Sequence, residues 1–156
     1  MDNAIRTNFE KLVANRLLSS DEEVLLFEEA LQFFVEEENP EHISLLCQAF
    51  DDDTEDYEVM FGLVHIIEAY DKKTSVETAT TEFVKAIPSL LKRGEEWLEV
   101  LLIRILNDDT SRIVFAQVIG DADKTTRSTT LNKLKKIAKE DPEEFGDKVA
   151  DLISNM

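Results

Sequence analysis

The sequence has few of the residues that build tight turns: four Gly and three Pro among 156 residues. All-β folds need many turns made from these residues, so their scarcity argues against a sandwich or barrel and predicts helices joined by short loops. Because single domains usually span about 100–200 residues, we expect one all-α domain over residues 1–156.

Residues that carry common catalytic chemistry are also scarce. The only histidines are His42 and His65, and no spacing typical of a zinc site, such as His-Glu-x-x-His, is present. The four glycines are isolated, which excludes a Gly-rich phosphate loop. The single cysteine, Cys47, lies among apolar residues and acids and is interpreted as a buried structural thiol. We therefore expect no enzyme, no cofactor and no metal site.

The acidic run Asp51-Asp52-Asp53 invites a comparison with calcium-binding loops. An EF-hand loop that begins at Asp51 needs glycine at its sixth position and glutamate at its twelfth. The sequence has Asp56 and Gly62 at these two positions. The pattern therefore does not predict an EF-hand.

The chain lacks a basic N-terminal region followed by an apolar run, as a secretory signal would have. Its most apolar stretch, residues 97–106, contains Glu99 and Arg104 and is shorter than the roughly 20 residues of a membrane span. Together with the single cysteine, these absences predict a cytoplasmic protein that does not enter a membrane.

Apolar residues recur at helical spacing along the whole chain. Two of the expected helices, 55–70 and 97–107, are apolar almost all round, and they align when one is shifted by 36 residues. A period of roughly 36–40 residues is typical of stacked helix pairs. We expect a short α-solenoid of HEAT-like antiparallel helix pairs, and the alternative is an irregular multi-helix bundle. The expected helices cover residues 3–18, 20–37, 40–50, 55–70, 74–88, 97–107, 110–119 and 125–139, with a last one after Asp141.

Local signals predict where these helices begin and end. Ser20, Thr54 and Thr74 are expected to cap the helices that follow them. Pro88 is expected to kink or end its helix, and Gly94 to separate the next one.

Basic residues are absent from the segment between Leu17 and Asp71, and charge is therefore uneven. The net charge is −17; residues 1–78 hold 20 acids and 5 bases, and residues 79–156 hold 14 acids and 12 bases. An acidic half of net −15 repels nucleic acid and attracts basic surfaces. We predict a partner-binding face made of Glu22, Glu29, Glu36, Asp51, Asp52, Asp53, Glu55 and Asp56.

The basic residues of the C-terminal half have simpler interpretations. The lysines of 125–139 lack interleaved aromatics that would stack on bases, so we expect them to balance acids within the molecule and not to bind nucleic acid. Arg104 lies in an apolar helix and needs a carboxylate, for which Asp108 is the expected partner.

One segment also carries a resemblance to a known class of protein. The segment Trp97-Leu-Glu-Val-Leu-Leu-Ile-Arg-Ile-Leu-Asn-Asp-Asp-Thr-Ser-Arg112, which follows an acidic helical half, resembles small helical immunity proteins of bacterial polymorphic-toxin systems of the contact-dependent inhibition type. The resemblance implies a protein in the cytosol of a toxin-producing bacterium that blocks its cognate toxin by stoichiometric binding. Such toxins are often basic nucleases, which would suit the acidic half.

These features agree with four functions to different degrees. The first is an inhibitor of a basic protein, most simply a cognate toxin, through the acidic face. The alternative is a helical-repeat scaffold or adaptor that holds a peptide or helix in its groove. Mimicry of DNA comes third, and an enzyme comes last because its site would have to be built from carboxylates alone.

Overall fold

The computed structural model describes residues 1–156 and contains nine helices and no strand. The all-α prediction is confirmed. The helices are α1 (Asn3–Ala14), α2 (Asp21–Val35), α3 (His42–Cys47), α4 (Tyr57–Lys73), α5 (Val76–Arg93), α6 (Glu95–Leu106), α7 (Asp109–Gly120), α8 (Lys124–Glu140) and α9 (Pro142–Ser154).

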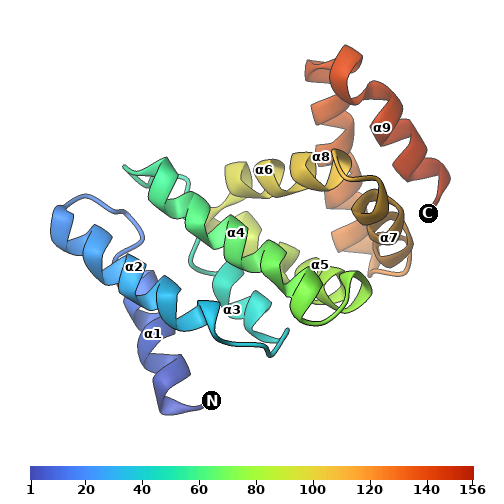
Figure 1. Ribbon diagram of the computed structural model, residues 1–156. Helices are drawn as coiled ribbons and strands as arrows, with labels where there is room; N and C mark the ends of the chain where they lie inside the picture. The colour runs from blue at the N-terminus through green and yellow to red at the C-terminus, as the bar shows by residue number, and fades with distance from the viewer.

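The chain progresses from α1 at one end of the molecule to the α8–α9 hairpin at the other, and the two termini lie far apart (Figure 1). Contacts with both the helix that follows and the helix after that are made by α3, α5, α6 and α7, and α2 packs on α4. Helix α5 lies in the middle, against α3, α4, α6, α7 and α8.

The hydrophobic core is continuous and receives buried side chains from all nine helices. Its largest fully buried members include Phe27, Phe34 and Tyr70. Burying one such side chain stabilises the fold by roughly 1.5–3 kcal/mol. The helix faces predicted from apolar spacing therefore meet in one interior.

The two nearly all-apolar helices, α4 and α6, contact each other through a few side chains. The centres of the Phe61 and Trp97 rings lie 5.9 Å apart in an edge-to-face arrangement. Further along, Glu68 accepts two hydrogen bonds from Arg104, at 2.7 and 2.8 Å. Residues of both pairs are 36 positions apart, which is the shift that aligns these helices in sequence.

Two of the three predicted caps are wrong by one or two positions. Helix α4 is capped by Asp56, whose carboxylate accepts a hydrogen bond from Val59 N at 3.0 Å, and not by Thr54. Helix α5 is capped by Ser75, whose hydroxyl accepts from Thr78 N at 3.1 Å, and not by Thr74. Adjacent Ser, Thr and Asp residues offer equivalent cap oxygens, and only the backbone decides which one precedes the first turn.

The capping prediction at Ser20 is confirmed with one difference. The Ser20 hydroxyl accepts a hydrogen bond from Glu23 N at 3.1 Å. The Glu23 carboxylate, however, reaches back to Ser19 N at 2.9 Å and not to the cap residue itself. At the last helix, Asp141 and Pro142 begin α9 as expected.

The prediction that Pro88 can end its helix is wrong, because α5 continues through Pro88 to Arg93. Pro88 is exposed, whereas Ile87 and Leu90 are buried on either side of it. The burial of these two side chains helps offset the roughly 3 kcal/mol that an internal proline costs. Gly94 then separates α5 from α6, where a β-carbon would lie 2.9 Å from Phe50 Cβ.

Candidate functional site

Asp51 is the buried centre of the loop between α3 and α4. Its side chain is 4% exposed, and Oδ2 lies 3.3 Å from Arg16 Nε and 3.7 Å from an Arg93 nitrogen. Its other oxygen accepts a hydrogen bond from Asp53 N at 2.8 Å. Since Arg16 follows α1 and Arg93 ends α5, this carboxylate holds three segments together. Partial burial and Arg93 lower the pKa of Arg16, and the charge of Asp51 acts in the opposite direction.

The next acid of the loop also has an internal role. Asp52 accepts hydrogen bonds from Glu96 N, at 3.1 Å to each carboxylate oxygen, and from Trp97 N at 3.4 Å. Its carboxylate thus lies at the N-terminus of α6, where the helix dipole favours a negative charge. In the same loop, Asp56 caps α4. Three of the predicted binding residues, Asp51, Asp52 and Asp56, therefore stabilise the fold of the loop.

Tyr57 is an exposed aromatic residue fixed on a buried aromatic stack. The Phe50 and Trp97 rings stack at 5.5 Å, and the Tyr57 ring lies 5.5 Å from Trp97 on α6. Trp97 is 2% exposed, whereas Tyr57 is 55% exposed. The Tyr57 hydroxyl donates to Asp52 O at 3.2 Å, and Trp97 Nε1 donates to Asp51 O at 3.2 Å. These contacts hold the exposed ring in one orientation.

The linker between α1 and α2 borders the same surface. Glu55 N donates a hydrogen bond to Leu17 O at 2.8 Å. Leu17 is 44% exposed, and the next residue, Leu18, is buried with a φ of 51°. A non-glycine residue in this left-handed region costs on the order of 1 kcal/mol, which the burial of the Leu18 side chain offsets.

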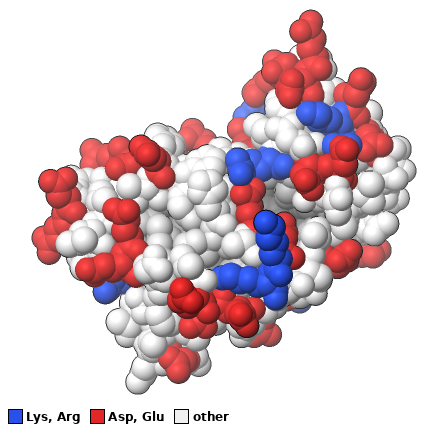
Figure 2. Space-filling view, in the orientation of Figure 1, with Lys and Arg blue, Asp and Glu red and all other residues white.

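The remaining predicted acids are exposed. Asp53 and Glu55 form no side-chain ion pair or hydrogen bond and lie beside Tyr57 in sequence. Glu22 lies in the first turn of α2, Glu29 lies 3.6 Å from Lys11, and Glu36 ends the helix. In Figure 2, acidic atoms surround the left-hand end of the molecule, where α2 and α4 begin.

The structure brings together only part of the predicted face. Fourteen residues of helix rise by about 21 Å, so Glu22 and Glu36 lie at opposite ends of α2. The loop acids lie near the N-terminal end of α2 because Glu55 bonds to Leu17. We name the exposed set Asp53, Glu55 and Tyr57 the loop face. Tyr57 was missed as a site residue because its apolar helix pattern indicated burial.

The predicted partner of Arg104 is wrong. Arg104 pairs with Glu68 of α4, and the hydrogen bond raises the pKa of Arg104. Asp108 instead caps α7 by accepting a hydrogen bond from Ser111 N at 2.9 Å, which lowers the pKa of Asp108. Asp108 is close to Arg104 in sequence, but as the cap residue its side chain is directed at α7.

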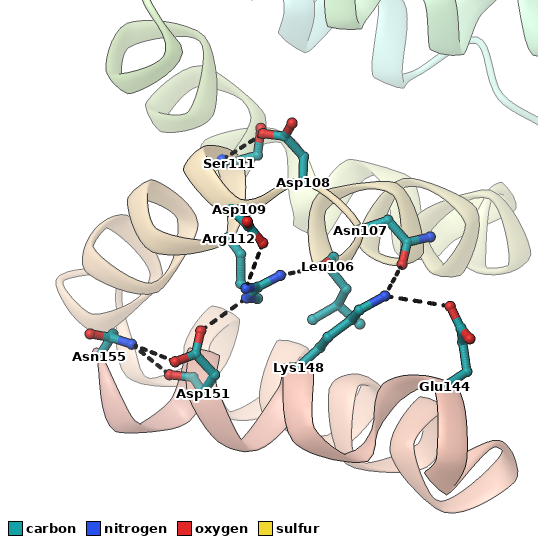
Figure 3. A network of polar contacts seen from close by, with 10 residues as sticks. All are labelled: Leu106, Asn107, Asp108, Asp109, Ser111, Arg112, Glu144, Lys148, Asp151 and Asn155. Atoms are coloured by element: carbon teal, nitrogen blue, oxygen red, sulfur yellow. Dashed lines mark hydrogen bonds and ion pairs between the residues drawn. The ribbon is translucent and has the colours of Figure 1, made fainter.

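The turn between α6 and α7 is joined to α9 by a network of charged groups (Figure 3). Arg112 donates to Leu106 O at 2.6 Å, to Asp109 at 2.9 Å and to Asp151 of α9 at 3.0 Å. Lys148 of α9 donates to Asn107 at 2.8 Å. The conspicuous Asn-Asp-Asp-Thr-Ser-Arg sequence therefore fixes how α9 packs on this turn.

Two lysines of α8 contact acids of α6. Lys133 pairs with Glu95, and Lys136 pairs with Glu99 at 2.7 Å. The pKa of Glu95 is lowered by its hydrogen bond to Lys133. At these two lysines the predicted internal balance of charge is present.

Cys47 is buried, and burial raises the pKa of its thiol. No group of three or more His, Cys, Asp or Glu side chains is arranged to hold a metal ion. None of the nine helices combines the length and apolar character that crossing a membrane requires.

Comparison with protein families identifies both the class of this protein and its family. The class is that of immunity proteins, which neutralise a cognate toxin, and it agrees with the resemblance drawn from the Trp97–Arg112 segment. Residues 14–115, more than half of the chain, match the family described as Immunity protein 30, and the chain belongs to that family. No curated protein and no solved structure matches the chain. The matched segment contains the loop face and Trp97, whereas α8 and α9 lie outside it.

Proposed function

We propose that the protein neutralises a basic toxin, such as a nuclease, by forming a stoichiometric complex through the loop face. Membership of an immunity family supports the toxin as partner. The observation that supports the loop face as the binding site is the exposed ring of Tyr57, which is held on the buried Trp97. Asp53 and Glu55 are exposed and unpaired beside it. In this proposal the protein acts in the cytosol of the cell that makes the toxin, and it acts by binding and not by catalysis.

The exposed carboxylates give this binding its speed. Opposite charges on two partners steer their encounter, and association can reach roughly 10⁸–10⁹ M⁻¹s⁻¹ at low salt. The excess charge of −15 in residues 1–78 supplies such a field. Glu22, Glu29 and Glu36 lie along α2 and act at a distance in this proposal, while Asp53 and Glu55 touch the partner. Asp51, Asp52 and Asp56 act by shaping the loop.

Tyr57 gives the binding its affinity. Interface energy is concentrated in a few central residues, among which tyrosine is enriched, and rigid anchors lose little entropy on binding. The stack on Trp97 and the hydrogen bond to Asp52 O fix the Tyr57 ring before the partner arrives. Its 55% exposure leaves one side of the ring to contact the partner.

We expect Tyr57→Ala to weaken the toxin complex by about 30-fold, which corresponds to about 2 kcal/mol. Tyr57→Phe keeps the ring and should retain affinity within about threefold. Isothermal titration calorimetry with the purified toxin measures both changes. The matched control is Ile113→Ala on α7, which removes another exposed apolar side chain, 47% exposed. Equal losses for Tyr57→Ala and Ile113→Ala would contradict an anchor at Tyr57.

The contacts between helices support a solenoid arrangement of the single domain. Four of the side-chain pairs that join different helices are separated by similar numbers of residues: 36 for Arg104 and Glu68, 37 for Lys136 and Glu99, 38 for Lys133 and Glu95, and 39 for Arg112 and Asp151. Separations close to one repeat length are expected when helix pairs stack in sequence. We propose a short stack of HEAT-like pairs over residues 1–156.

A scaffold that holds a peptide is the second candidate function. It is favoured by a hollow between α4 and α6, which contact each other at few positions. In that case substitutions of apolar residues in the hollow would impair partner binding more than acid-to-amide substitutions in the loop face.

Capture of the partner tests the proposal. Tagged protein is incubated with a lysate of its own organism at low salt, and bound proteins are released by moderate salt. The proposal predicts one basic protein in one-to-one ratio, whose toxic activity stops when it is recombined with the purified immunity protein. Capture of several apolar partners that resist salt would contradict it and favour the scaffold.

A further inference from the structure

A hollow lies between α4, α5 and α6. Its volume is about 540 Å³, and its apolar lining includes Ile67, Phe83, Leu101 and Ile105. In Figure 2 a recess near the middle of the face is bordered by both basic and acidic atoms. A space of this size is within the range of sites that hold a small ligand or a short peptide segment.

Charged groups surround the mouth of this hollow. Glu68, Asp71 and Lys72 come from α4, Arg104 comes from α6, and Asp108 precedes α7. The residues of α5 that line the hollow, which include Val76, Ala79, Thr80 and Phe83, are uncharged.

Asp71 is the carboxylate that has no partner. Arg104 already pairs with Glu68, and Asp108 already accepts the hydrogen bond from Ser111 N. Asp71 makes no ion pair or side-chain hydrogen bond, although it is partly buried. Burial, then Glu68 and Asp108, raise the pKa of Asp71 to about 6. A partly buried carboxylate that repels its neighbours is stabilised when a cation enters beside it.

We propose that this hollow receives an arginine side chain of the partner protein, with the guanidinium against Asp71 and its aliphatic part on the apolar lining. Arginine suits the site because a guanidinium is less strongly hydrated than an ammonium group and pairs with carboxylates through a planar fork. The inference rests on the proposed function, since the arginine belongs to the basic toxin. It adds a second contact to the loop face.

The geometry predicts how such binding depends on pH. The occupant is attracted by the ionised form of Asp71, and apparent affinity scales with the fraction of protein in the competent form. With a pKa of about 6, this fraction rises by about tenfold between pH 5 and pH 7. Binding should therefore tighten as pH rises across this range.

A peptide titration tests the hollow without the toxin. The probe is acetyl-Leu-Arg-Leu-amide, and its uncharged isostere carries citrulline in place of arginine. Binding to ¹⁵N-labelled protein is followed by NMR at pH 5 and pH 7. We expect shifts at the amides of Thr80 and Ser111, which line the hollow. Affinity for the arginine peptide should be about tenfold higher at pH 7, and the citrulline peptide should bind at least several-fold more weakly.

Two variants make the result decisive. Asp71→Asn should remove both the pH dependence and the preference for arginine, whereas Asp147→Asn, exposed on α9, should leave them unchanged. Equal binding of the two peptides, shifts confined to the loop face, or an Asp71→Asn variant that behaves as the wild type would overturn the inference. These results would leave the proposed function standing, because toxin neutralisation is measured separately.

The toxin supplies a second readout. At pH 7 the complex with Asp71→Asn should dissociate at least several-fold faster than the wild-type complex. An unchanged dissociation rate would show that the hollow does not receive a side chain of the toxin and would overturn the inference. If the wild-type protein did not bind the toxin at all, this result would instead contradict the proposed function.

Discussion

The two halves of the chain differ in how their carboxylates are used. In residues 79–156 the acids often meet bases within the molecule, as in Glu95 with Lys133, Glu99 with Lys136, and Asp151 with Arg112. In residues 1–78 the paired acids are few and include the buried Asp51, while Asp53 and Glu55 have no partner. The C-terminal half therefore uses charge to pack its helices, whereas much of the negative charge of the N-terminal half has no basic partner within the molecule.

The largest effect is expected inside the acidic loop itself. Asp51→Ala removes the carboxylate between Arg16 and Arg93, and removing one partner of a buried ion pair costs about 3 kcal/mol or more. Asp53→Ala, two residues away and exposed, should change stability by less than about 0.5 kcal/mol. Urea denaturation followed by Trp97 fluorescence measures both. Equal stabilities of the two variants would show that Asp51 contributes no more to the fold than the exposed Asp53 does.

A smaller effect is expected where the C-terminal half is held by ion pairs. Arg112, whose side chain is 13% exposed, contacts Leu106 O, Asp109 and Asp151. Arg112→Gln should lower the free energy of unfolding by about 1.5 kcal/mol, the lower end of what hydrogen bonds to charged groups contribute. Lys135→Gln is the control, because Lys135 is exposed on α8. A loss no greater than that of the control would show that the network in Figure 3 contributes little to packing.

Asp71→Asn is expected to stabilise the protein slightly at neutral pH. The pKa of Asp71 in the folded state, about 6, lies above its ordinary value of 3.8. The folded state therefore binds this proton more tightly than the unfolded chain, and the resulting stability, present below about pH 4, is lost as pH rises towards 6. Allowing for solvent screening, the gain from Asp71→Asn at pH 7 is roughly 1 kcal/mol.

Urea denaturation at pH 4 and pH 7 measures whether Asp71→Asn raises or lowers the free energy of unfolding. The variant and the wild type should differ little at pH 4, where the Asp71 carboxyl is protonated in the folded protein. A loss of stability in Asp71→Asn at pH 7 would mean that Asp71 has a stabilising partner. Asp71 would then belong with the paired carboxylates and not with the unpaired ones.

Local features were predictable from the sequence. The helices, the cap at Ser20 and the start of α9 at Asp141-Pro142 depend on residues within one turn of each other. The choice between Thr54 and Asp56 was not predictable, because both carry a cap oxygen and lie two residues apart. The passage of α5 through Pro88 depends on the burial of Ile87 and Leu90, which is a tertiary effect.

The candidate site could be predicted only in outline. The acidic segment was visible in sequence, but the partners of Asp51 come from Arg16 and Arg93, which precede it and follow it at a distance. Arg104 pairs with a residue 36 positions away and not with its neighbour Asp108. Tyr57 opens an apolar helix, and nothing in its spacing distinguishes an exposed ring from a buried one. Such features are decided by packing between helices.

The rate of association with the toxin tests the central claim most directly. Asp53→Asn with Glu55→Gln removes two free carboxylates of the loop face, while Glu143→Gln with Asp147→Asn removes two exposed carboxylates of α9. Stopped-flow fluorescence can use Trp97, the single tryptophan of the chain, which lies under Tyr57. We expect the loop variant to associate at least several-fold more slowly at low salt, with the difference shrinking as salt rises, and the α9 variant to stay within about twofold of wild type. Equal rates for the two variants would contradict a toxin-binding role for the loop face.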